Sequence, residues 1–276
     1  MSEPTPDSEK KTLLAESTEN EVVILDPDAV VNVTTDDEVE VKTKIAVLVA
    51  TPMRALTGFA EQHAAFLAEL AALSTDDTCP YEFIQAVVTG GRTWGRCQMI
   101  ANARKLKAKE YPNLKWIYWH DDDVEQTAAG LIRLLSHKLP VVGAMYTVKG
   151  KDPHWCANFL HEVELQKNGL LQVYELAIGA LLTHIEVYDH VEKKFPAILY
   201  TDRNTGERHN GYFQEVVIER VPYSEDYFFC WLLRHTGIGI FADTELKLKH
   251  RGSDGKLWPE EWPPIPIDEV AKEATD

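Results

Sequence analysis

The sequence lacks the short motifs that mark several common enzyme classes. It contains no GxGxxG dinucleotide loop, no P-loop, no GxSxG nucleophile turn and no HxE…PCxxC pattern of zinc deaminases. These absences argue against dinucleotide-binding oxidoreductases, P-loop nucleotide hydrolases, GxSxG serine hydrolases and zinc deaminases. Any chemistry must therefore come from residues outside these motifs.

Cysteine pairs and long apolar runs are also missing. The four cysteines, at positions 79, 97, 156 and 230, form no CxxC pair and no metal-finger spacing, so we expect reduced thiols, although the sequence leaves one disulfide open. The apolar runs are too short and too interrupted to span a membrane, and the first residues, MSEPTPDSEKK, lack the basic-then-apolar order of a signal peptide. We expect a cytoplasmic protein without a membrane partner.

The chain has no basic run and no stripe of alternating aromatic and basic residues, which are the usual marks of a nucleic-acid-binding surface. Its formal net charge is −16, and most of this charge lies near the two ends of the chain. Residues 1–43 hold 12 acidic and 3 basic side chains, and residues 259–276 hold 6 and 1. Because the middle of the chain is close to neutral, the acidic total does not exclude nucleic acid as a partner, and it does not favour one.

Composition divides the chain into three parts. Residues 1–43 are rich in Glu, Asp, Thr and Pro, which predicts a mostly disordered acidic tail. Its apolar patch, EVVILDPDAVVNV, is expected to be either a short docking segment for a protein partner or a strand-forming segment. Residues 44–258 are long enough to bury a sizeable core and are predicted to form one domain. Residues 259–276 hold four prolines and predict an extended acidic tail.

Apolar segments alternate with segments of helical spacing in the middle part, as in an α/β protein. The first segment, KIAVLVATPM, ends in Thr-Pro and is typical of a buried parallel strand. The pattern predicts strands at 44–53, 81–91, 116–120 and 141–148, and helices at 57–73, 96–111 and 127–138. This order predicts a mostly parallel sheet with helices on both faces. An apolar segment at 170–191, a hydrophobic helix at 224–237 and a strand at 238–250 follow.

Three consecutive aspartates lie at the end of the third predicted strand, in WIYWHDDDVEQ. Ligands of parallel α/β sheets gather at the carboxyl ends of the strands. In an extended backbone Asp121 and Asp123 share one face while Asp122 points away, and such a D-x-D pair suits Mg²⁺ or Mn²⁺. The alternative is a solvated turn whose carboxylates favour the N-terminus of the next helix.

A second acidic group, Ser224-Glu225-Asp226, opens the helix at 224–237. Ser is a good N-cap and two acids suit the first turn of a helix, which is a complete structural explanation. The functional alternative makes Asp226 a general base, with Glu225 beside it. His250 ends the last predicted strand, where it is either a surface residue or a further ligand of the same metal ion.

Weaker candidates flank these residues. Thr51, Pro52 and Arg54 close the first strand, where a nucleotide would lie, and Arg96 and Arg104 belong to a basic helix that either serves nucleotide phosphates or is only solvated. Lys149 and Trp155 follow the fourth strand, where they would contact donor or acceptor. Trp155 is equally explained by stacking on a sugar or a base and by packing in the core.

Together these segments resemble a GT-A glycosyltransferase of the family-2-like kind that includes bacteriophage proteins. The resemblance covers residues 44–250 in order. It rests on KIAVLVATPM, on the stretch from IANARKLK through WIYWHDDDVEQ to VVGAMY, on ELAIGALLTHIEVYDHV, and on SEDYFFCWLLRHTGIGIFADTELKLKH. A single motif of this kind is weak evidence for the family, whereas four motifs in the right order are more specific to it. The resemblance implies a Rossmann-like GT-A sheet.

The resemblance also implies roles for several residues. Asp121 and Asp123 would bind a nucleotide-sugar, with UDP-sugar as the expected donor, through Mn²⁺ or Mg²⁺. His250 would be a further metal ligand, and Asp226 the base of an inverting transfer. The sequence departs from the family pattern in two places: Ala177-Ile178-Gly179 replaces Gly-x-Gly, and Thr183-His184 replaces the usual Ile/x-Arg. Both departures, including Gly179, lie near the acceptor side, so they affect the identity of the acceptor more than the donor chemistry.

The acceptor is left open at this point. For a phage protein in the host cytoplasm, a hydroxymethylated pyrimidine in DNA is one possibility, and a glycan or a protein is another. Two other functions compete with sugar transfer: a non-catalytic module that binds a nucleotide-sugar or glycan, and a metal-dependent phosphoesterase that uses the aspartates.

Overall fold

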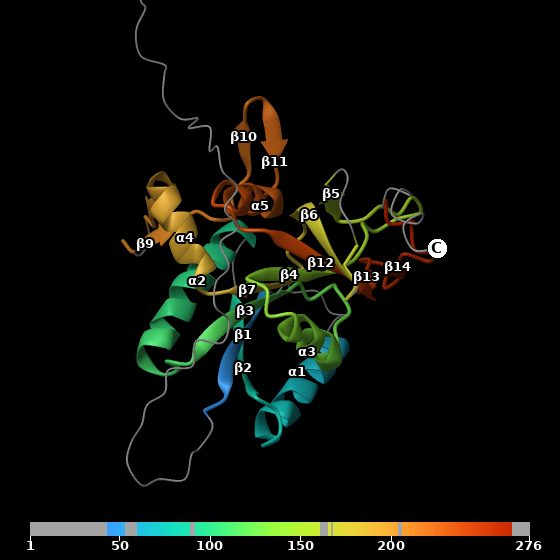
Figure 1. The fold of residues 1–276 in the computed structure, drawn as a ribbon, viewed down its shortest axis with the longest axis horizontal. Helices are drawn as coiled ribbons and strands as arrows, with labels where there is room; N and C mark the ends of the chain where they lie inside the picture. The colour runs from blue at the N-terminus through green and yellow to red at the C-terminus, as the bar shows by residue number, and fades with distance from the viewer. Residues whose placement is uncertain are drawn as a thin grey trace, which may run out of the picture.

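One eight-stranded sheet forms the centre of the molecule in the computed structural model, which describes residues 43–52, 60–88, 92–160, 165–166, 168–203 and 206–266 (Figure 1). The strands lie in the order β2-β1-β3-β7-β4-β12-β6-β5. Their bounds are Ile45–Pro52 (β1), Tyr81–Val88 (β2), Leu114–His120 (β3), Val141–Met145 (β4), Ala157–Phe159 (β5), Leu170–Leu176 (β6), Ala180–His184 (β7) and Ile240–Lys247 (β12).

The strand directions confirm the predicted α/β class and add two antiparallel strands. β1 pairs in parallel with β2 and β3, and β4 pairs in parallel with β12. β7 lies antiparallel between β3 and β4, and β6 lies antiparallel to β12 and β5. The predicted third and fourth strands are therefore not neighbours, because the apolar segment after residue 170 supplies the strand that separates them.

Five α-helices, among the described residues, cover the two faces of this sheet. They are Ala60–Thr75 (α1), Arg92–Lys109 (α2), Ala128–Ser136 (α3), Val187–Lys194 (α4) and Glu225–His235 (α5). α1 and α3 pack on one face, and α2, α4 and α5 on the other (Figure 1). None of the described helices is long and apolar enough to cross a bilayer. The four cysteines carry free thiols.

Alternation along the central strands divides the core into two layers. In β1, Val47 and Val49 join the cluster under α1 and α3, whereas Leu48 joins the cluster under α2, α4 and α5. In β3, Tyr118 and Trp119 divide in the same way. Since successive side chains of a strand point to opposite faces, a strand buried on both faces has the continuous apolar sequence seen here.

Short elements complete the chain around the sheet. They are the 3₁₀ turn Pro196–Ile198 (η1) and three two-stranded pairs: Leu199–Thr201 with Arg208–Asn210 (β8, β9), Val216–Ile218 with Val221–Tyr223 (β10, β11), and His250–Arg251 with Leu257–Trp258 (β13, β14). The β10–β11 pair projects from the sheet directly before α5 (Figure 1). The predicted strand at 238–250 is therefore two strands, β12 and β13, separated by an irregular stretch.

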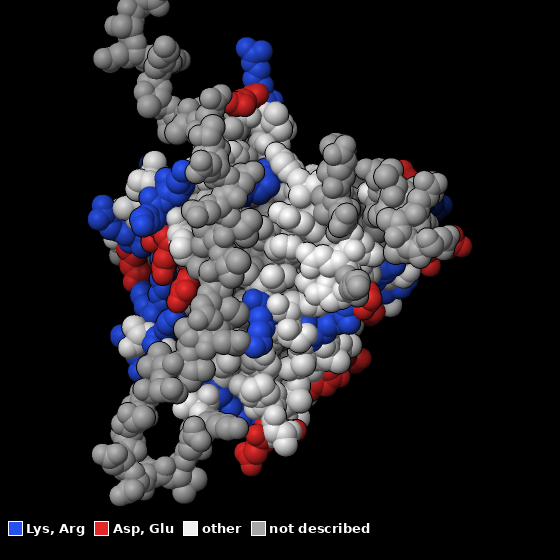
Figure 2. Space-filling model, viewed as in Figure 1, with Lys and Arg blue, Asp and Glu red and all other residues white. Residues whose placement is uncertain are grey.

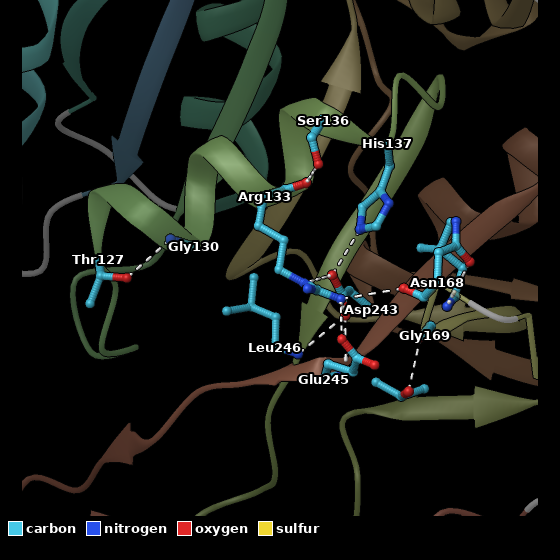
Figure 3. Close-up of polar contacts among 12 residues, drawn as sticks. Thr127, Gly130, Arg133, Ser136, His137, Asn168, Gly169, Asp243, Glu245 and Leu246 are labelled. Atoms are coloured by element: carbon cyan, nitrogen blue, oxygen red, sulfur yellow. Dashed lines mark hydrogen bonds and ion pairs between the residues drawn. The ribbon is translucent and has the colours of Figure 1, made fainter. Parts of the chain in front are cut away.

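A buried carboxylate, Asp243, lies inside β12, before this irregular stretch (Figure 3). Asp243 is fully buried, and its Oδ2 lies 2.5 Å from Nε of Arg133 and 2.8 Å from Nε2 of His137. Its Oδ1 accepts the backbone N–H groups of Glu245 and Leu246 at 3.0 and 3.2 Å. These bonds lie where the register between β12 and β4 shifts, so they stabilise the irregular part of β12.

Charges on the edge formed by α2 and α4 alternate in sign, with acidic side chains between the lysines and arginines (Figure 2). Arg104 of α2 lies 2.5 Å from both Asp189 and Glu192 of α4, and Lys105 lies 3.2 Å from Glu207. Such surface pairs contribute about 0–1 kcal/mol each. They also mean that the basic side of α2 is locally neutralised.

Candidate functional site

Four segments meet at the carboxyl end of the central strands. The aspartate triplet follows β3, the turn between β6 and β7 carries Gly179, α5 begins with Glu225 and Asp226, and β13 carries His250. Asp121 N–H donates to the carbonyl of Gly179 at 3.0 Å, and a backbone bridge joins Val124 to His250. The sheet thus brings together side chains that are more than 100 positions apart in the chain.

The aspartate triplet forms a turn, which corrects the expectation of an extended backbone. β3 ends at His120, and the N–H of Val124 donates to the carbonyl of Asp121 at 3.1 Å. The alternation rule therefore does not apply to the triplet. Asp121 is directed toward Arg96 of α2, whereas Asp123 is directed toward Lys149 and His250.

Arg96 is the centre of the first of two charged groups. Its side chain is only 1% exposed, with NH2 2.9 Å from Asp121 Oδ1 and NH1 2.5 Å from Asp226 Oδ1. Glu225 Oε1 lies 3.9 Å from NH1. One buried guanidinium thus compensates three neighbouring carboxylates, which would otherwise repel one another. We call Arg96, Asp121, Glu225 and Asp226 the arginine cluster.

Asp226 is held at the first turn of α5. Ser224 caps the helix by accepting the N–H of Tyr227, as its type and position predict. The Oδ2 of Asp226 accepts the N–H of Ile178 at 3.2 Å, and its side chain is 19% exposed. Burial raises the pKa of Asp226; the charge of Arg96 opposes this rise, and Asp121 and Glu225 add to it. A fixed carboxylate of raised pKa at a sheet edge is a candidate for a general base.

Asp123 is the centre of the second group. Its side chain is 3% exposed, with Oδ2 2.6 Å from Nζ of Lys149 and Oδ1 3.5 Å from Nε2 of His250. Burial alone would raise the pKa of Asp123, but hydrogen bonds from His250 and Lys149, together with their charges, lower it to about 2. Asp123 is therefore an anion at any physiological pH.

The orientation of His250 suits a cation beside Asp123. The Nδ1 of His250 lies 2.9 Å from the carbonyl oxygen of Thr147, which only accepts hydrogen bonds. Nδ1 therefore carries a proton, and Nε2 is the ring nitrogen directed toward Asp123. Histidines that bind a metal commonly donate the other ring N–H to a backbone carbonyl, as Nδ1 of His250 does to Thr147.

The side chains at this edge could hold a cation only if a substrate supplied further ligands. Within the residues described, no group of three or more His, Cys, Asp or Glu side chains is placed to hold a metal ion. Mg²⁺ commonly takes one or two carboxylates and completes its shell with water and substrate phosphates. Asp123 and His250 could supply two ligands of such a shared site, provided that the ammonium of Lys149, 2.6 Å from Asp123 Oδ2, moves aside.

Tyr146 connects the two groups and was not among the candidates from sequence. Its hydroxyl accepts the N–H of Gly179 at 3.0 Å, and its ring lies edge-on to the ring of His250, 5.2 Å between centroids. A Cβ on Gly179 would lie 2.7 Å from this hydroxyl and 3.2 Å from Asp121 Oδ2. Gly179 therefore permits the close approach of Tyr146 and Asp121. The sequence signal that could have identified Tyr146 was its place at the polar end of VVGAMY, at the carboxyl end of β4.

The remaining candidates lie around these groups. Asp122 lines a narrow hollow on the α1 side of the turn, together with His63, His120 and Gln126. Burial, and then the charges of Asp123 and Asp121, raise the pKa of Asp122 to about 6. Asp122 thus does not share the surroundings of Asp121 or Asp123.

The structure places the residues predicted to contact a nucleotide in different surroundings. Thr51 is buried near the end of β1 and Pro52 is the last residue of that strand, whereas Arg54 lies outside the described residues. Arg104 is bound to acidic side chains of α4, away from the arginine cluster. Trp155 is 6% exposed and stacks on Trp262. A sugar would have to displace Trp262 to stack on that face.

Comparisons with known proteins give structural likenesses only. No protein-family profile matches the sequence, and no match was found among curated proteins. A197 from STIV has a TM-score of 0.41 at 12% identity, over 81% of this chain and 98% of that one. The glycosyltransferase involved in the glycosylation of the major capsid of PBCV-1 has a TM-score of 0.29 at 12% identity, over 72% and 92%.

A nucleotidyl-transfer enzyme also matches. The 4-diphosphocytidyl-2C-methyl-D-erythritol synthase of Anaerococcus prevotii has a TM-score of 0.33 at 7% identity, over 58% of this chain and 80% of that one. All three TM-scores lie below 0.5, so none of these likenesses is evidence for the reaction.

Proposed function

We propose that this protein is a metal-dependent glycosyltransferase that moves a sugar from a nucleotide-sugar, a UDP-sugar by preference, to an acceptor hydroxyl with inversion. The observation that carries the proposal is that a carboxylate of raised pKa, Asp226, and a carboxylate–imidazole pair, Asp123 and His250, lie at the same edge of the sheet. Tyr146 and Gly179 connect them. In this proposal one edge of the sheet would hold both the base and the diphosphate of the donor.

Each part of the site has a distinct role in this proposal. Asp123 and His250 would hold Mn²⁺ or Mg²⁺, which, when bound, supplies positive charge that stabilises the diphosphate leaving group. Lys149 lies beside the same carboxylate and would contribute a further positive charge. Asp226 would accept the proton of the incoming hydroxyl, while Arg96 holds it in place.

The acceptor is proposed from the surface charges. Arg104 and Lys105 of α2 are paired with acidic side chains, which weakens their attraction for the phosphates of duplex DNA. We therefore place a glycan or protein hydroxyl ahead of a hydroxymethylated pyrimidine in DNA.

A non-catalytic module that binds a nucleotide-sugar is the second candidate, and one observation favours it. Both carboxylate oxygens of Asp226 already have partners, Arg96 and the N–H of Ile178, as in a carboxylate with a structural role. A base must also direct a free lone pair toward the incoming hydroxyl, whereas a carboxylate with a structural role need not.

The variant Asp226→Asn separates the two functions. It keeps the shape of the side chain but cannot take a proton at pH 7. We expect metal-dependent binding of the donor to persist while sugar transfer, or hydrolysis of the donor in the absence of acceptor, falls by a factor of about 10² or more. Undiminished turnover in this variant would refute the assignment of the base. Binding without turnover by the unmodified protein would favour the module, and phosphate release without sugar transfer would favour a phosphoesterase.

A further inference from the structure

The described residues that follow β13 lie against the loop that carries Lys149. Trp262 stacks on Trp155 with 5.6 Å between ring centroids and 8° between planes. The Nε1–H of Trp155 donates to the carbonyl of Pro264 at 3.0 Å, and Nζ of Lys249 lies 5.0 Å from the ring centroid of Trp262. Trp262 and Ile265 also pack against the larger core cluster. We call residues 257–266 the C-terminal segment.

These contacts continue directly to His250. In the β13–β14 pair His250 lies opposite Trp258, and the N–H of Arg251 donates to the carbonyl of Asp123 at 2.7 Å. On its other side, His250 is bonded through Nδ1 to Thr147, and an isolated backbone bridge joins Thr147 to Trp155. His250 therefore lies between two segments that the Trp155–Trp262 stack joins.

We propose that the C-terminal segment is a clamp that positions His250 beside Asp123, with Trp262 as its principal positioning residue. β13 has only two residues, too few for its ladder alone to fix an imidazole. The stack of two indoles, an ammonium over one ring and the bond to Pro264 add the contacts that a short ladder lacks. The expected effect of the clamp on metal binding rests on the proposed function, whereas its role in holding β13 in place does not.

The test uses the full chain and two readouts. Amide hydrogen exchange over residues 249–252 reports how firmly β13 is held, and calorimetric titration with Mn²⁺ alone reports the proposed cation site. In Trp262→Ala we expect exchange at Arg251 to rise about tenfold or more, and the Kd for Mn²⁺ to rise about tenfold. Trp262→Phe keeps an aromatic ring for stacking and is expected to restore both values most of the way.

A matched control is Trp231→Ala on α5. The ring of Trp231 lies against those of Phe195, Phe228 and His235, which are all outside the C-terminal segment. Trp231→Ala also removes one indole ring. We expect this variant to lower overall stability without a selective rise in amide exchange at residues 249–252. An equal rise at 249–252 in both alanine variants would overturn the clamp, because the effect would then be general.

The remaining outcomes separate the clamp from the proposed function. Unchanged exchange in a folded Trp262→Ala protein overturns the clamp. If exchange rises but the unmodified protein binds no Mn²⁺, the clamp stands and the proposed cation site fails. If Trp262→Ala does not fold, Lys249→Met decides: it removes the ammonium beside Trp262, so faster exchange at Arg251 supports the clamp and unchanged exchange overturns it.

Discussion

The guanidinium of Arg96 lies 2.5 Å from the carboxylate of Asp226, although 130 positions separate them in the chain. The same guanidinium binds Asp121 at 2.9 Å. Arg96 therefore joins α2, the end of β3 and the start of α5 at one point. A residue proposed as a base and a residue at the aspartate turn share one buried cation, so the electrostatics of the site depend on Arg96.

Replacing Arg96 by Met is expected to destabilise the fold by about 3–5 kcal/mol, because it leaves partly buried carboxylates without their cation. The free energy of unfolding from urea titration measures this. Arg104→Met is the control, since Arg104 lies on the same helix with 32% of its side chain exposed and makes only surface pairs. Its cost is expected to be about 0–1 kcal/mol. Equal costs for both variants would contradict the central role of Arg96.

The close approach at Gly179 gives a second prediction. A methyl group there would lie 2.7 Å from the hydroxyl of Tyr146 and 3.2 Å from Asp121, so Gly179→Ala must displace one of them. We expect a loss of about 1–3 kcal/mol in unfolding free energy and weaker donor binding. In Gly130→Ala on α3 the nearest atom is the flexible end of Leu246 at 3.2 Å, so this control is expected to be neutral or slightly stabilising. Wild-type stability in Gly179→Ala would show that the site is looser than described.

Asp243 gives a prediction about pH. Burial opposes ionisation of Asp243, but the hydrogen bonds from Arg133 and His137 outweigh it, and the pKa of Asp243 is lowered in the folded state. Its contribution to stability is therefore present above the unfolded pKa of about 3.9 and is lost as the pH falls through the folded value. Asp243→Asn should cost several kcal/mol, about 3–5, at pH 6 and distinctly less at pH 3.

Urea titrations at the two pH values measure this difference. Glu245→Gln is the control because Glu245 binds the same Arg133 at 2.6 Å with 60% of its side chain exposed. It should cost less than about 1 kcal/mol at either pH. A pH-independent cost for Asp243→Asn would mean that the carboxylate is not the charged centre of the network in Figure 3.

Periodicity predicted much of the fold, because buried strands and amphipathic helices leave a local pattern. The segments at 116–120 and 224–237 correspond to β3 and α5. The direction of a strand leaves no such pattern. All five residues of β7 are buried, so ALLTH has the same apolar character in either direction. Its place between β3 and β4 is decided by tertiary pairing.

The residue types of the candidate site can be found in the sequence, whereas their contacts cannot. An acidic turn after β3, a capped acidic start of α5 and a histidine after β12 are visible as sequence. The partner of each carboxylate is not, because Arg96, Lys149 and Tyr146 come from other elements. The expected pairing of Asp121 with Asp123 on one face failed for a local reason: the strand ends one residue before the triplet.

The most direct measurement is calorimetric titration of nucleotide-sugars, UDP-sugars first, into the protein with and without Mn²⁺. The proposed function predicts that one donor binds in a metal-dependent way, and that Asp123→Ala weakens this binding about tenfold or more while Glu125→Gln, which alters a nearby carboxylate bound to Arg251, leaves it unchanged. The same affinity with and without metal, in both the unmodified protein and Asp123→Ala, would contradict it.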